Sequence, residues 1–397
     1  MRFGSSIAAF TLGASLAPAA AFPTTVSRDV SGNPFAGRKL TINHSYGKKL
    51  EATFDAFVEA GDELNARKTR TVQTTGTFYW ISNIASLSAL DEAISVARAE
   101  QNQGGVPQVV GLVLYNLPDR DCSAGESAGE LSGRDGLRRY KEEYVNAWAV
   151  RLARASDLTF AVVVEPDAIG NMVTNQGIPL CASAKPIQEE GIAYAISKLQ
   201  LPNVNLYLDA SHGGWLGWAD NLPLGHSGLA AAQFKEIITL SGNTTKVRGF
   251  STNVSNYNPF QATVRENYTE WNPSWDEDHY ASSLAPFLEA QGLPARFITD
   301  QSRVHLPGAR AEWGEWCNVS PSGLGRPQAT DTGNEYVDSL VWVKPPGESD
   351  GQCGLEGAPP AGVWFNEYVK MLVENAHEDV VPADSLERTT KSWWPQY

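Results

Sequence analysis

The feature that most constrains this chain is an alternation of short apolar segments with longer helical ones. Near-continuous runs of Val, Ile, Leu and Phe predict strands buried on both faces, as in a parallel sheet that is covered by helices on both sides. The expected strands are residues 78–83, 109–116, 159–164, 205–208, 247–252, 296–299 and 339–343. The expected helices are residues 90–101, 136–155, 186–199, 229–240, 282–291 and 362–376.

Seven such strands in one domain predict an α/β fold with a closed or nearly closed parallel barrel, similar to a TIM barrel. An open, doubly wound sheet is the alternative. No Gly-x-Gly-x-x-Gly motif follows the first expected strand, which disfavours the nucleotide-binding form of that alternative. Because the sequence shows no internal repeat and no Ser/Thr/Pro-rich linker, we expect one catalytic domain without a carbohydrate-binding module.

Polar side chains follow nearly every expected strand. In strand order they are Trp80 and Ser82, then Asp119 to Asp121, Glu165 and Asp167, Asp209 and His212, Asn253 and Asn256, Asp300 and Arg303, and finally Lys344. One carboxylate in such a place is most simply a helix N-cap. Seven strand ends that all carry polar groups instead predict an active site, because the carboxyl ends of parallel strands form one rim.

The carboxylates at this rim favour acid/base hydrolysis. The sequence has no nucleophile elbow and no metal-ligand spacing, whereas glycoside hydrolysis needs two carboxyl groups with separated pKa values. Asp121 and Asp167 follow adjacent strands, so they are the candidate pair. A second negative charge close to a carboxyl group raises its pKa and keeps it protonated as a proton donor.

Aromatic residues and charge indicate the ligand class. Six of the 12 tryptophans cluster at or after strand ends, and about half of these are expected in the core. They are Trp80, Trp215, Trp218, Trp313, Trp316 and Trp342. A net charge of −14 disfavours phosphate-bearing partners, so we expect neither nucleic acid nor an anionic membrane as a partner. Flat indole faces suit sugar rings.

A metal-dependent hydrolase or isomerase is a second interpretation, because Asp and Glu at successive strand ends also describe Mg²⁺ sites. Against it, Lys344 and Arg303 add positive charge at the same rim. His212 is the one histidine at the rim, and we expect it to orient a neighbour through a hydrogen bond. The sequence therefore predicts no metal and no cofactor.

The first 21 residues predict a secretory signal peptide. Arg2 precedes a mostly apolar stretch and the small residues 19–21, after which we place the cleavage site; a buried N-terminal helix is the alternative. The mature protein would be residues 22–397, secreted and extracellular. No later apolar stretch approaches the ~20 residues of a membrane span.

Secretion predicts that the four cysteines form two disulfides, for which three pairings are possible. Zinc ligation is the rival, but the ligand spacing is missing. Cys122 and Cys181 each follow a strand end, and Cys317 and Cys353 share the last third of the chain, so these are the expected pairs. Glycosylation sequons begin at Asn43, Asn243, Asn253, Asn267 and Asn318.

Two segments carry a family resemblance. Residues 114–122, Leu-Tyr-Asn-Leu-Pro-Asp-Arg-Asp-Cys, resemble the first signature of the family six glycoside hydrolases, which include fungal cellobiohydrolase II and related endoglucanases. Residues 164–169, Val-Glu-Pro-Asp-Ala-Ile, resemble the second signature. The likeness continues through residues 207–212, 252–258, 313–318 and 342–348, and spans the chain from about residue 33 to its end.

The resemblance implies a distorted seven-stranded β/α barrel, a monomer, and hydrolysis of β-1,4-glucosidic bonds of cellulose and related β-glucans with inversion. By position, Asp167 matches the general acid, Asp121 the carboxylate that keeps it protonated, and Asp350 the proposed base. Tyr115 matches a residue that distorts the sugar ring, Ser127 one that contacts the water chain, and Asp209 a neighbour of the acid. The implied substrate contacts are Trp80, Ser82, His212, Trp215, Trp218, Asn256, Trp316, Lys344 and Glu348. The family's disulfides match the pairing proposed above.

Three departures from the family pattern bear on specificity. Ser82 stands where an Asp is common, and Ser349 interrupts the usual Glu-Cys-Asp. Residues 344–364 are shorter than in cellobiohydrolases, where this segment and residues 122–132 roof the cleft into a tunnel. A half-open roof favours an endoglucanase. The alternatives are a cellobiohydrolase that releases cellobiose from non-reducing chain ends and, more remotely, a glucan-binding protein without catalysis.

Overall fold

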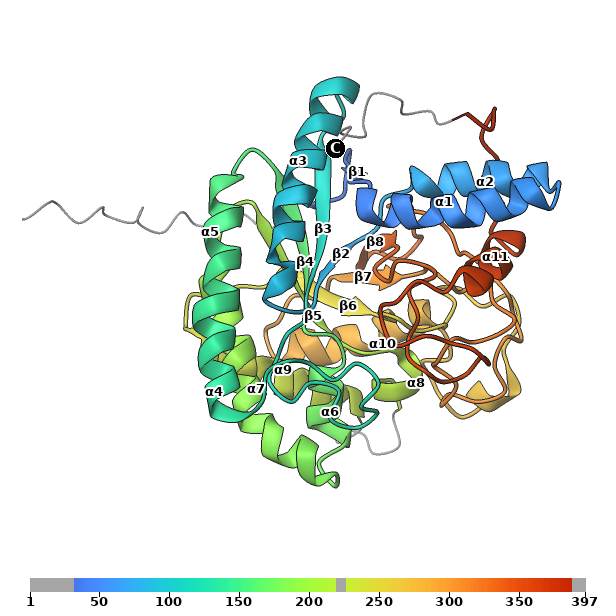
Figure 1. Ribbon diagram of the computed structural model, residues 1–397. Helices are drawn as coiled ribbons and strands as arrows, with labels where there is room; N and C mark the ends of the chain where they lie inside the picture. Colours follow the sequence, from blue (N-terminus) through green and yellow to red (C-terminus); the bar gives the residue numbers. More distant parts are fainter. Residues whose placement is uncertain (1–31, 219–225, 388–397) are drawn as a thin grey trace, which may run out of the picture.

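The computed structural model describes residues 32–218 and 226–387 and contains a curled parallel sheet (Figure 1). Its strands are β1 (Lys39–Leu40), β2 (Tyr79–Ile81), β3 (Gln108–Leu114), β4 (Thr159–Val164), β5 (Val204–Asp209), β6 (Gly249–Thr252), β7 (Phe297–Asp300) and β8 (Val337–Val341). The seven predicted strands are confirmed within a few residues. Two-residue β1 was not predicted, because so short a segment has no recognisable periodicity.

The eight strands occupy seven positions in the sheet. All pairs are parallel, and the order is β1-β3-β4-β5-β6-β7-β8, with β2 also paired to β3. β1 pairs with the start of β3 and β2 with its end, so the two share one edge of β3. At the carboxyl end, the Phe78 backbone N–H donates to the carbonyl oxygen of Trp342 at 3.1 Å, which joins the first position to the last. The predicted distorted barrel is therefore confirmed.

Successive residues of each strand are buried in two different layers. In β3, Val109 and Val113 belong to a cluster inside the barrel, whereas Val110, Leu112 and Leu114 pack outward against the helices. All five are fully buried. This two-sided burial explains why the strands read as continuous apolar runs rather than as alternating ones.

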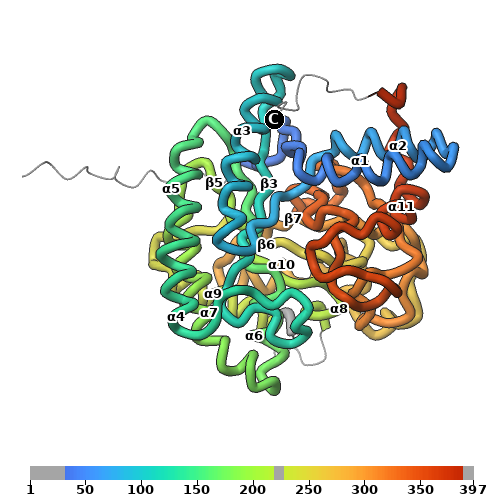
Figure 2. Tube along the Cα trace, in the orientation of Figure 1, coloured from blue at the N-terminus to red at the C-terminus, as the bar shows by residue number. Residues whose placement is uncertain are grey.

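Helices cover the outside of the barrel (Figures 1 and 2). They are α1 (His44–Glu59), α2 (Glu63–Gln73), α3 (Ser88–Gly104), α4 (Gly133–Arg139), α5 (Asn146–Arg154), α6 (Ala168–Thr174), α7 (Pro179–Lys198), α8 (Gly213–Leu216), α9 (His226–Ser241), α10 (Glu277–Ala290) and α11 (Asn366–Glu374). Helices α3, α5, α7, α9 and α10 contribute to the main core against the sheet. Helices α1, α2 and α11 form a second cluster around Trp342.

The helix predictions need three corrections. Helices α1, α2, α6 and α8 were not predicted, although Asn43 and Asp62 cap α1 and α2 through their side chains. The expected helix 136–155 is interrupted by a π-helical turn, Tyr140–Val145, which turns Tyr140 and Tyr144 into the core. Helix α7 begins at Pro179, whereas the predicted helix began at Pro186. Pro186 lies inside α7.

The predicted signal peptide, residues 1–21, lies outside the described residues. None of the helices in the described ranges is both long and apolar enough to span a membrane.

Candidate active site

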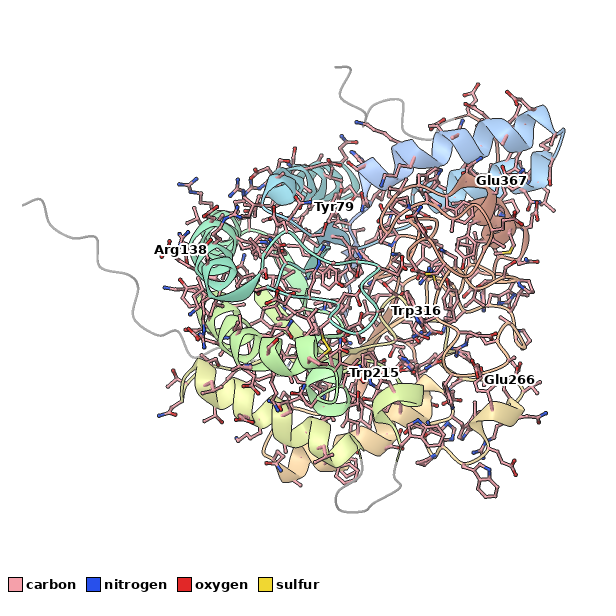
Figure 3. The ribbon with its side chains drawn as sticks, turned by 60° about the horizontal axis from the view of Figure 1, so that its bottom comes forward. Tyr79, Arg138, Trp215, Glu266, Trp316 and Glu367 are labelled. Carbon is pink, nitrogen blue, oxygen red and sulfur yellow. A yellow bond between two sulfur atoms is a disulfide. The ribbon has the colours of Figure 1, made fainter. Side chains whose placement is uncertain are left out.

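A cleft of about 630 Å³ lies at the carboxyl ends of the strands. It brings together all but one of the catalytic and substrate-contacting residues that the family resemblance implies. Its walls include Trp80, Ser82, Tyr115, Asp121, Ser127, Asp167, His212, Trp215, Trp218, Asn256, Trp316, Lys344, Glu348 and Asp350. Figure 3 shows Trp215 and Trp316 in this region of the molecule. The exception is Asp209, which is buried below the cleft.

The backbone at this rim adopts an unusual conformation. Asp121, Glu165, Asp167, Ser211 and Asn253 all have positive φ angles, between 51° and 66°. Side-chain-bearing residues rarely take this conformation, and it clusters at functional sites where the surrounding structure enforces it. Here it follows the ends of β3 to β6, so the chain turns sharply at each strand end and directs polar groups towards one point.

Asp167 lies at the start of α6, and its surroundings favour the protonated carboxyl group. Burial raises its pKa well above the ordinary value, and the negative charges of Asp209 and Asp121 raise it further. Lys344 opposes these effects without cancelling them. The Asp167 backbone N–H donates to Asp209 Oδ1 at 2.9 Å, so Asp209 also fixes the position of the residue. Asp167 is therefore suited to donate a proton.

Asp209 acts through its neighbours rather than on a bound ligand. Burial raises its pKa to about 6, although N–H groups of Asp167 and Ser211 donate to its carboxylate. The 2.9 Å bond to Asp167 and the 3.1 Å bond to Ser211 tie the ends of β4 and β5 together. Asp209 therefore positions Asp167, the acid beside which the family resemblance places it.

Asp121 is held by the loop that follows β3. Its Oδ2 accepts the backbone N–H of Ser127 at 2.7 Å and the Ser127 hydroxyl at 3.1 Å. The same hydroxyl lies 2.8 Å from the Tyr115 hydroxyl. Arg120 stacks over the Tyr115 ring at 4.2 Å and donates to the carbonyl oxygens of Ser82 and Ser127, at 2.7 and 2.9 Å. These contacts connect Asp121, Ser127 and Tyr115 in one polar network.

Asp350 has the opposite electrostatic environment from Asp167. Burial alone would raise its pKa, but Arg303 and Lys344 outweigh this effect and hold the pKa below the ordinary value. Arg303 pairs with Oδ2 at 2.7 Å, and Lys344 Nζ lies 3.3 Å from Oδ1. Tyr257 and the Asn318 backbone N–H also donate to Oδ2, at 3.1 and 3.0 Å. Asp350 is therefore ionised and only weakly basic.

Three of the four expected sugar platforms are anchored by their indole nitrogens. Trp80 donates to Val343 O at 2.9 Å. Trp215 donates to Thr174 Oγ1 and Trp218 to Gly214 O, both at 2.7 Å. These bonds fix the planes of the rings, and all three rings are half-buried and line the cleft. Trp342 follows β8 directly and is fully buried, so it belongs to the half of the six tryptophans that was expected in the core.

Nδ1 of His212 accepts a hydrogen bond and does not donate one. Arg310 donates to Asn258 Oδ1, so the Asn258 amide nitrogen faces His212 Nδ1 at 3.2 Å and Glu277 Oε1 at 2.7 Å. Burial, with help from Arg310, lowers the pKa of His212 to about 3, so the ring is neutral. The remaining ring proton then lies on Nε2, where His212 can donate it to a ligand in the cleft.

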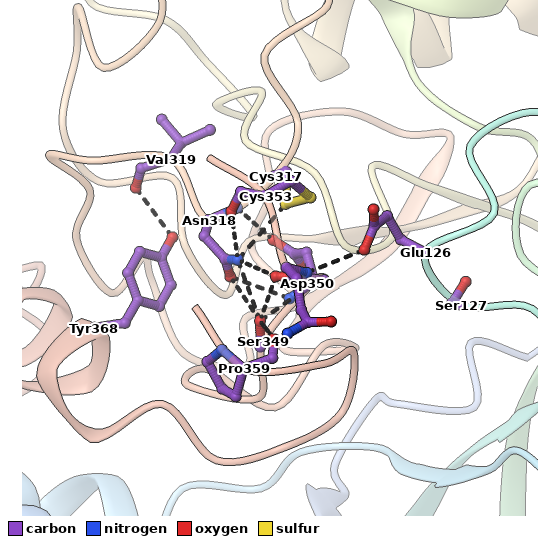
Figure 4. The surroundings of a disulfide bond; sticks show 12 residues. Glu126, Ser127, Cys317, Asn318, Val319, Ser349, Asp350, Cys353, Pro359 and Tyr368 are labelled. Carbon is purple, nitrogen blue, oxygen red and sulfur yellow. Dashed lines mark hydrogen bonds between the residues drawn. A yellow bond between two sulfur atoms is a disulfide. The ribbon is translucent and has the colours of Figure 1, made fainter. Parts of the chain in front are cut away.

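Two loops approach each other over the cleft. Disulfides Cys122–Cys181 and Cys317–Cys353, both as predicted, fix one loop each. Glu126 Oε2 accepts the backbone N–H of Gln352 at 3.0 Å (Figure 4). Within the described ranges, this is the one hydrogen bond found between residues 122–132 and residues 344–364. The roof is thus closed at this point, although by a single exposed hydrogen bond.

The comparisons with known proteins agree with this geometry. A model of the family described as glycosyl hydrolases family 6 matches residues 35–376. The chain belongs to glycosyl hydrolase family 6. This family 6 enzyme is 54% identical to the 1,4-beta-D-glucan cellobiohydrolase CEL6B of Podospora anserina, over 99% of this chain and 92% of the relative. It is 55% identical to Endoglucanase-6B of Humicola insolens, over 88% of this chain and 99% of the relative.

Solved structures lead to the same family. The structure of endoglucanase CEL6B from Humicola insolens has a TM-score of 0.85 with this enzyme at 54% identity, covering 88% of this chain and 100% of the other. Cellobiohydrolase II (CEL6A) from Humicola insolens, in complex with glucose and cellotetraose, has a TM-score of 0.79 at 39% identity, covering 87% and 99%. Relatives of this family 6 enzyme therefore carry both endoglucanase and cellobiohydrolase names.

Several residues that organise the site were not selected from the sequence. Glu277 accepts the Gly213 N–H at 2.9 Å and so holds the start of α8, which carries Trp215. Arg310 orients Asn258, and Tyr257 contacts Asp350. Glu277 lies in an Asp-rich helix start, and nothing in that pattern distinguishes it from an ordinary capping residue.

A group of side chains that could hold a metal ion lies outside the cleft. Within the described residues, His305, His377 and Glu378 place their ligand atoms within 4.8 Å of one another. They line a second cavity, of about 650 Å³, which shares Trp313 with the catalytic cleft. None of the cleft's carboxylates belongs to this group.

Proposed function

We propose that this family 6 enzyme is a cellulase that hydrolyses β-1,4-glucosidic bonds with inversion at the anomeric carbon. The observation that carries the proposal is the contrast between two carboxyl groups in one aromatic cleft: the pKa of Asp167 is raised and that of Asp350 is lowered. Glycoside hydrolysis needs such a separation between an acid and an ionised carboxylate. The names of the relatives, and a relative's complex with cellotetraose, support a β-1,4-glucan as substrate.

In the proposed reaction, Asp167 donates its proton to the glycosidic oxygen as the bond to the leaving sugar breaks. A water molecule attacks the anomeric carbon from the opposite face. An inverting site keeps acid and base about 6.5–9.5 Å apart to leave room for this water. The rings of Trp80, Trp215, Trp218 and Trp316 would stack on sugars along the chain.

The water has two carboxylates that could influence it. The network of Asp121, Ser127 and Tyr115 offers hydroxyl groups that could orient the water and relay its proton. Asp350 is the proposed base. Because its pKa is lowered, its carboxylate is a weak base, and it accepts the proton of the attacking water only in the transition state, as that proton leaves the water. Asp121 has the further role of keeping Asp167 protonated by its negative charge.

For the mode of attack we propose predominantly internal cleavage. The loops over the cleft are joined by one exposed hydrogen bond, and such a bond stabilises by about 0.5–1.5 kcal/mol. This energy corresponds to about a 2- to 13-fold preference for the closed roof, so an open form remains well populated. A chain could then enter from the side. The alternative, release of cellobiose from non-reducing ends, would require a roof that stays closed over many turnovers.

The remaining proposals concern the whole protein. We propose that residues 1–21 are removed on secretion and that residues 22–397 act as one monomeric catalytic domain.

Two measurements test the proposed function together. NMR of the first product from cello-oligomers must show the α-anomer, since inversion of a β-linked chain produces it. Carboxymethyl cellulose must lose viscosity before much reducing sugar accumulates. A β-anomer would refute inversion and the base role of Asp350. Near-exclusive cellobiose with sustained viscosity would refute internal cleavage but not the chemistry.

A further inference from the structure

The structure divides the five glycosylation sequons into two groups. Asn43, Asn253 and Asn318 are buried, at 6%, 0% and 1% exposure, whereas Asn243 and Asn267 lie on the surface. A sequon alone does not distinguish them, because each has the same Asn-x-Ser/Thr pattern. Their hydrogen bonds do.

Asn253 has no hydrogen available for a glycan. Its Nδ2 donates to the carbonyl oxygens of Asn258 and Asp300, at 2.9 and 2.8 Å. A glycan bonded to Nδ2 replaces one of its two hydrogens, so one of these buried carbonyls would lose its donor. The sugar would also have to fit among fully buried strand ends. A folded molecule therefore excludes a glycan at Asn253.

Asn318 is excluded for the same reason. Its Nδ2 donates to the carbonyl oxygens of Gly351 and Cys353, at 2.9 and 3.0 Å, and its Oδ1 accepts the Asp350 N–H at 3.1 Å (Figure 4). A glycan would separate the loop that carries Asp350 from its anchor.

At Asn43, Oδ1 caps α1 through the Tyr46 N–H at 3.0 Å, and Nδ2 donates to Phe78 O at 3.3 Å.

Asn243 and Asn267 are free of such constraints. Asn243 lies in the exposed turn between α9 and β6, and Asn267 begins the 3₁₀ turn Asn267–Thr269. Across the described part of the chain, neither side chain amide has a hydrogen-bond partner in the structure. A glycan there would extend into solvent and would disrupt no contact.

We propose that the secreted protein carries N-linked glycans at Asn243 and Asn267 and at none of the other three sequons. The inference rests on the proposed secretion through a glycosylating pathway. In the transfer step, the amide Nδ2 forms a bond to C1 of the first sugar of a lipid-linked oligosaccharide diphosphate. The bond from C1 to the diphosphate oxygen breaks, the lipid diphosphate leaves with the electron pair, and Nδ2 loses one proton to a base of the transferase.

The two glycans would lie at opposite ends of the barrel. Asn243 precedes β6, so its glycan projects from the amino ends of the strands. Asn267 follows β6 at the carboxyl end, and its neighbour Tyr268 contacts the edge of Trp313 at 5.2 Å between ring centroids. Trp313 in turn contacts Trp218 at 6.5 Å. The Asn267 glycan therefore stands beside one end of the catalytic cleft, whereas the Asn243 glycan is remote from it.

The test is peptide mapping of active protein purified from the medium of a yeast host. Enzymatic removal of N-glycans in H₂¹⁸O converts each glycosylated Asn into ¹⁸O-labelled Asp. We expect label at Asn243 and Asn267 alone. Label at Asn43, Asn253 or Asn318, or absence of label at either exposed site, would overturn the assignment.

Variants provide a second measurement on intact protein. N243Q and N267Q must each lower the mass by one glycan, and the double variant must have the mass of the polypeptide. T245S is the matched control, because it keeps the Asn243 sequon and must keep its glycan. Producing the chain both with its own leader and with a yeast leader separates failure of secretion from failure of this assignment, since the yeast leader delivers the protein to the pathway in either case.

Discussion

Removal of the Glu126 carboxylate tests whether the loop contact controls access to the cleft. In E126A, the Gln352 N–H loses its acceptor and the one hydrogen bond found between the two described loops disappears. Because the contact is exposed, water replaces the carboxylate, so the cost is the net bond energy of about 0.5–1.5 kcal/mol. We therefore expect the open roof to become about 2- to 13-fold more populated relative to the closed one.

The assay is the ratio of viscosity loss to reducing ends released from carboxymethyl cellulose. An open roof admits more internal segments, so E126A is expected to raise this ratio by up to the same factor. Q352A is the matched control. It alters the other partner of the contact but keeps the backbone N–H that donates to Glu126. If E126A and Q352A give the ratio of the unchanged enzyme, the contact has no part in access. If both variants raise it equally, the cause is loss of side-chain bulk rather than of the bond.

Three further predictions concern the acid and its surroundings. D167N must abolish hydrolysis, because an amide cannot donate the proton and a general acid contributes ~10²–10⁴ in rate. Binding of cello-oligomers, measured by calorimetry, must remain. Near-normal turnover would refute the assignment. D209N, and to a smaller extent D121A, must lower the pKa of Asp167 by removing a negative neighbour. Since the acid works only when protonated, the fall in rate at high pH must shift to lower pH, and an unmoved fall would show that the groups are not coupled. Burial raises the pKa of the Glu277 carboxyl group to about 7, and E277Q removes this titrating group but keeps the Oε1 acceptor for Gly213. We therefore expect kcat and KM of E277Q to change by less than 3-fold. E277A must raise KM for cello-oligomers because it releases α8, and an unchanged KM in E277A would contradict the positioning role.

The parallel arrangement made the site predictable from the sequence. Because the carboxyl ends of parallel strands meet at one rim, locating the strands was sufficient to bring Asp121, Asp167 and Lys344 together. Strand β4, Thr159–Val164, agrees with its predicted bounds, since it is a continuous apolar run that ends at Glu165-Pro166. Residue identity then selected sugar chemistry, because indole rings accompany the carboxylates.

The partners of these residues were not predictable in the same way. Arg303 and Asp350 are 47 positions apart, and Glu277 meets Gly213 across 64 positions. Contacts between distant loops leave no periodic pattern in a sequence, so these pairings were not predicted. Helices α1 and α2 escaped prediction for a related reason: their apolar face packs against α11 and Trp342, far along the chain, rather than against the sheet.

The charge balance of the cleft explains why the two carboxyl groups differ. Burial raises the pKa of both Asp167 and Asp350, so burial alone would make each of them an acid. The cations are unevenly shared: Arg303 and Lys344 both pair directly with Asp350, whereas Asp167 has negative neighbours in Asp209 and Asp121. Asp350 is therefore ionised, and its charge adds to those that keep the proton on Asp167. The ion pairs with Arg303 and Lys344 thus weaken Asp350 as a base but widen the difference between its pKa and that of Asp167. An inverting reaction depends on this difference between proton acceptor and proton donor.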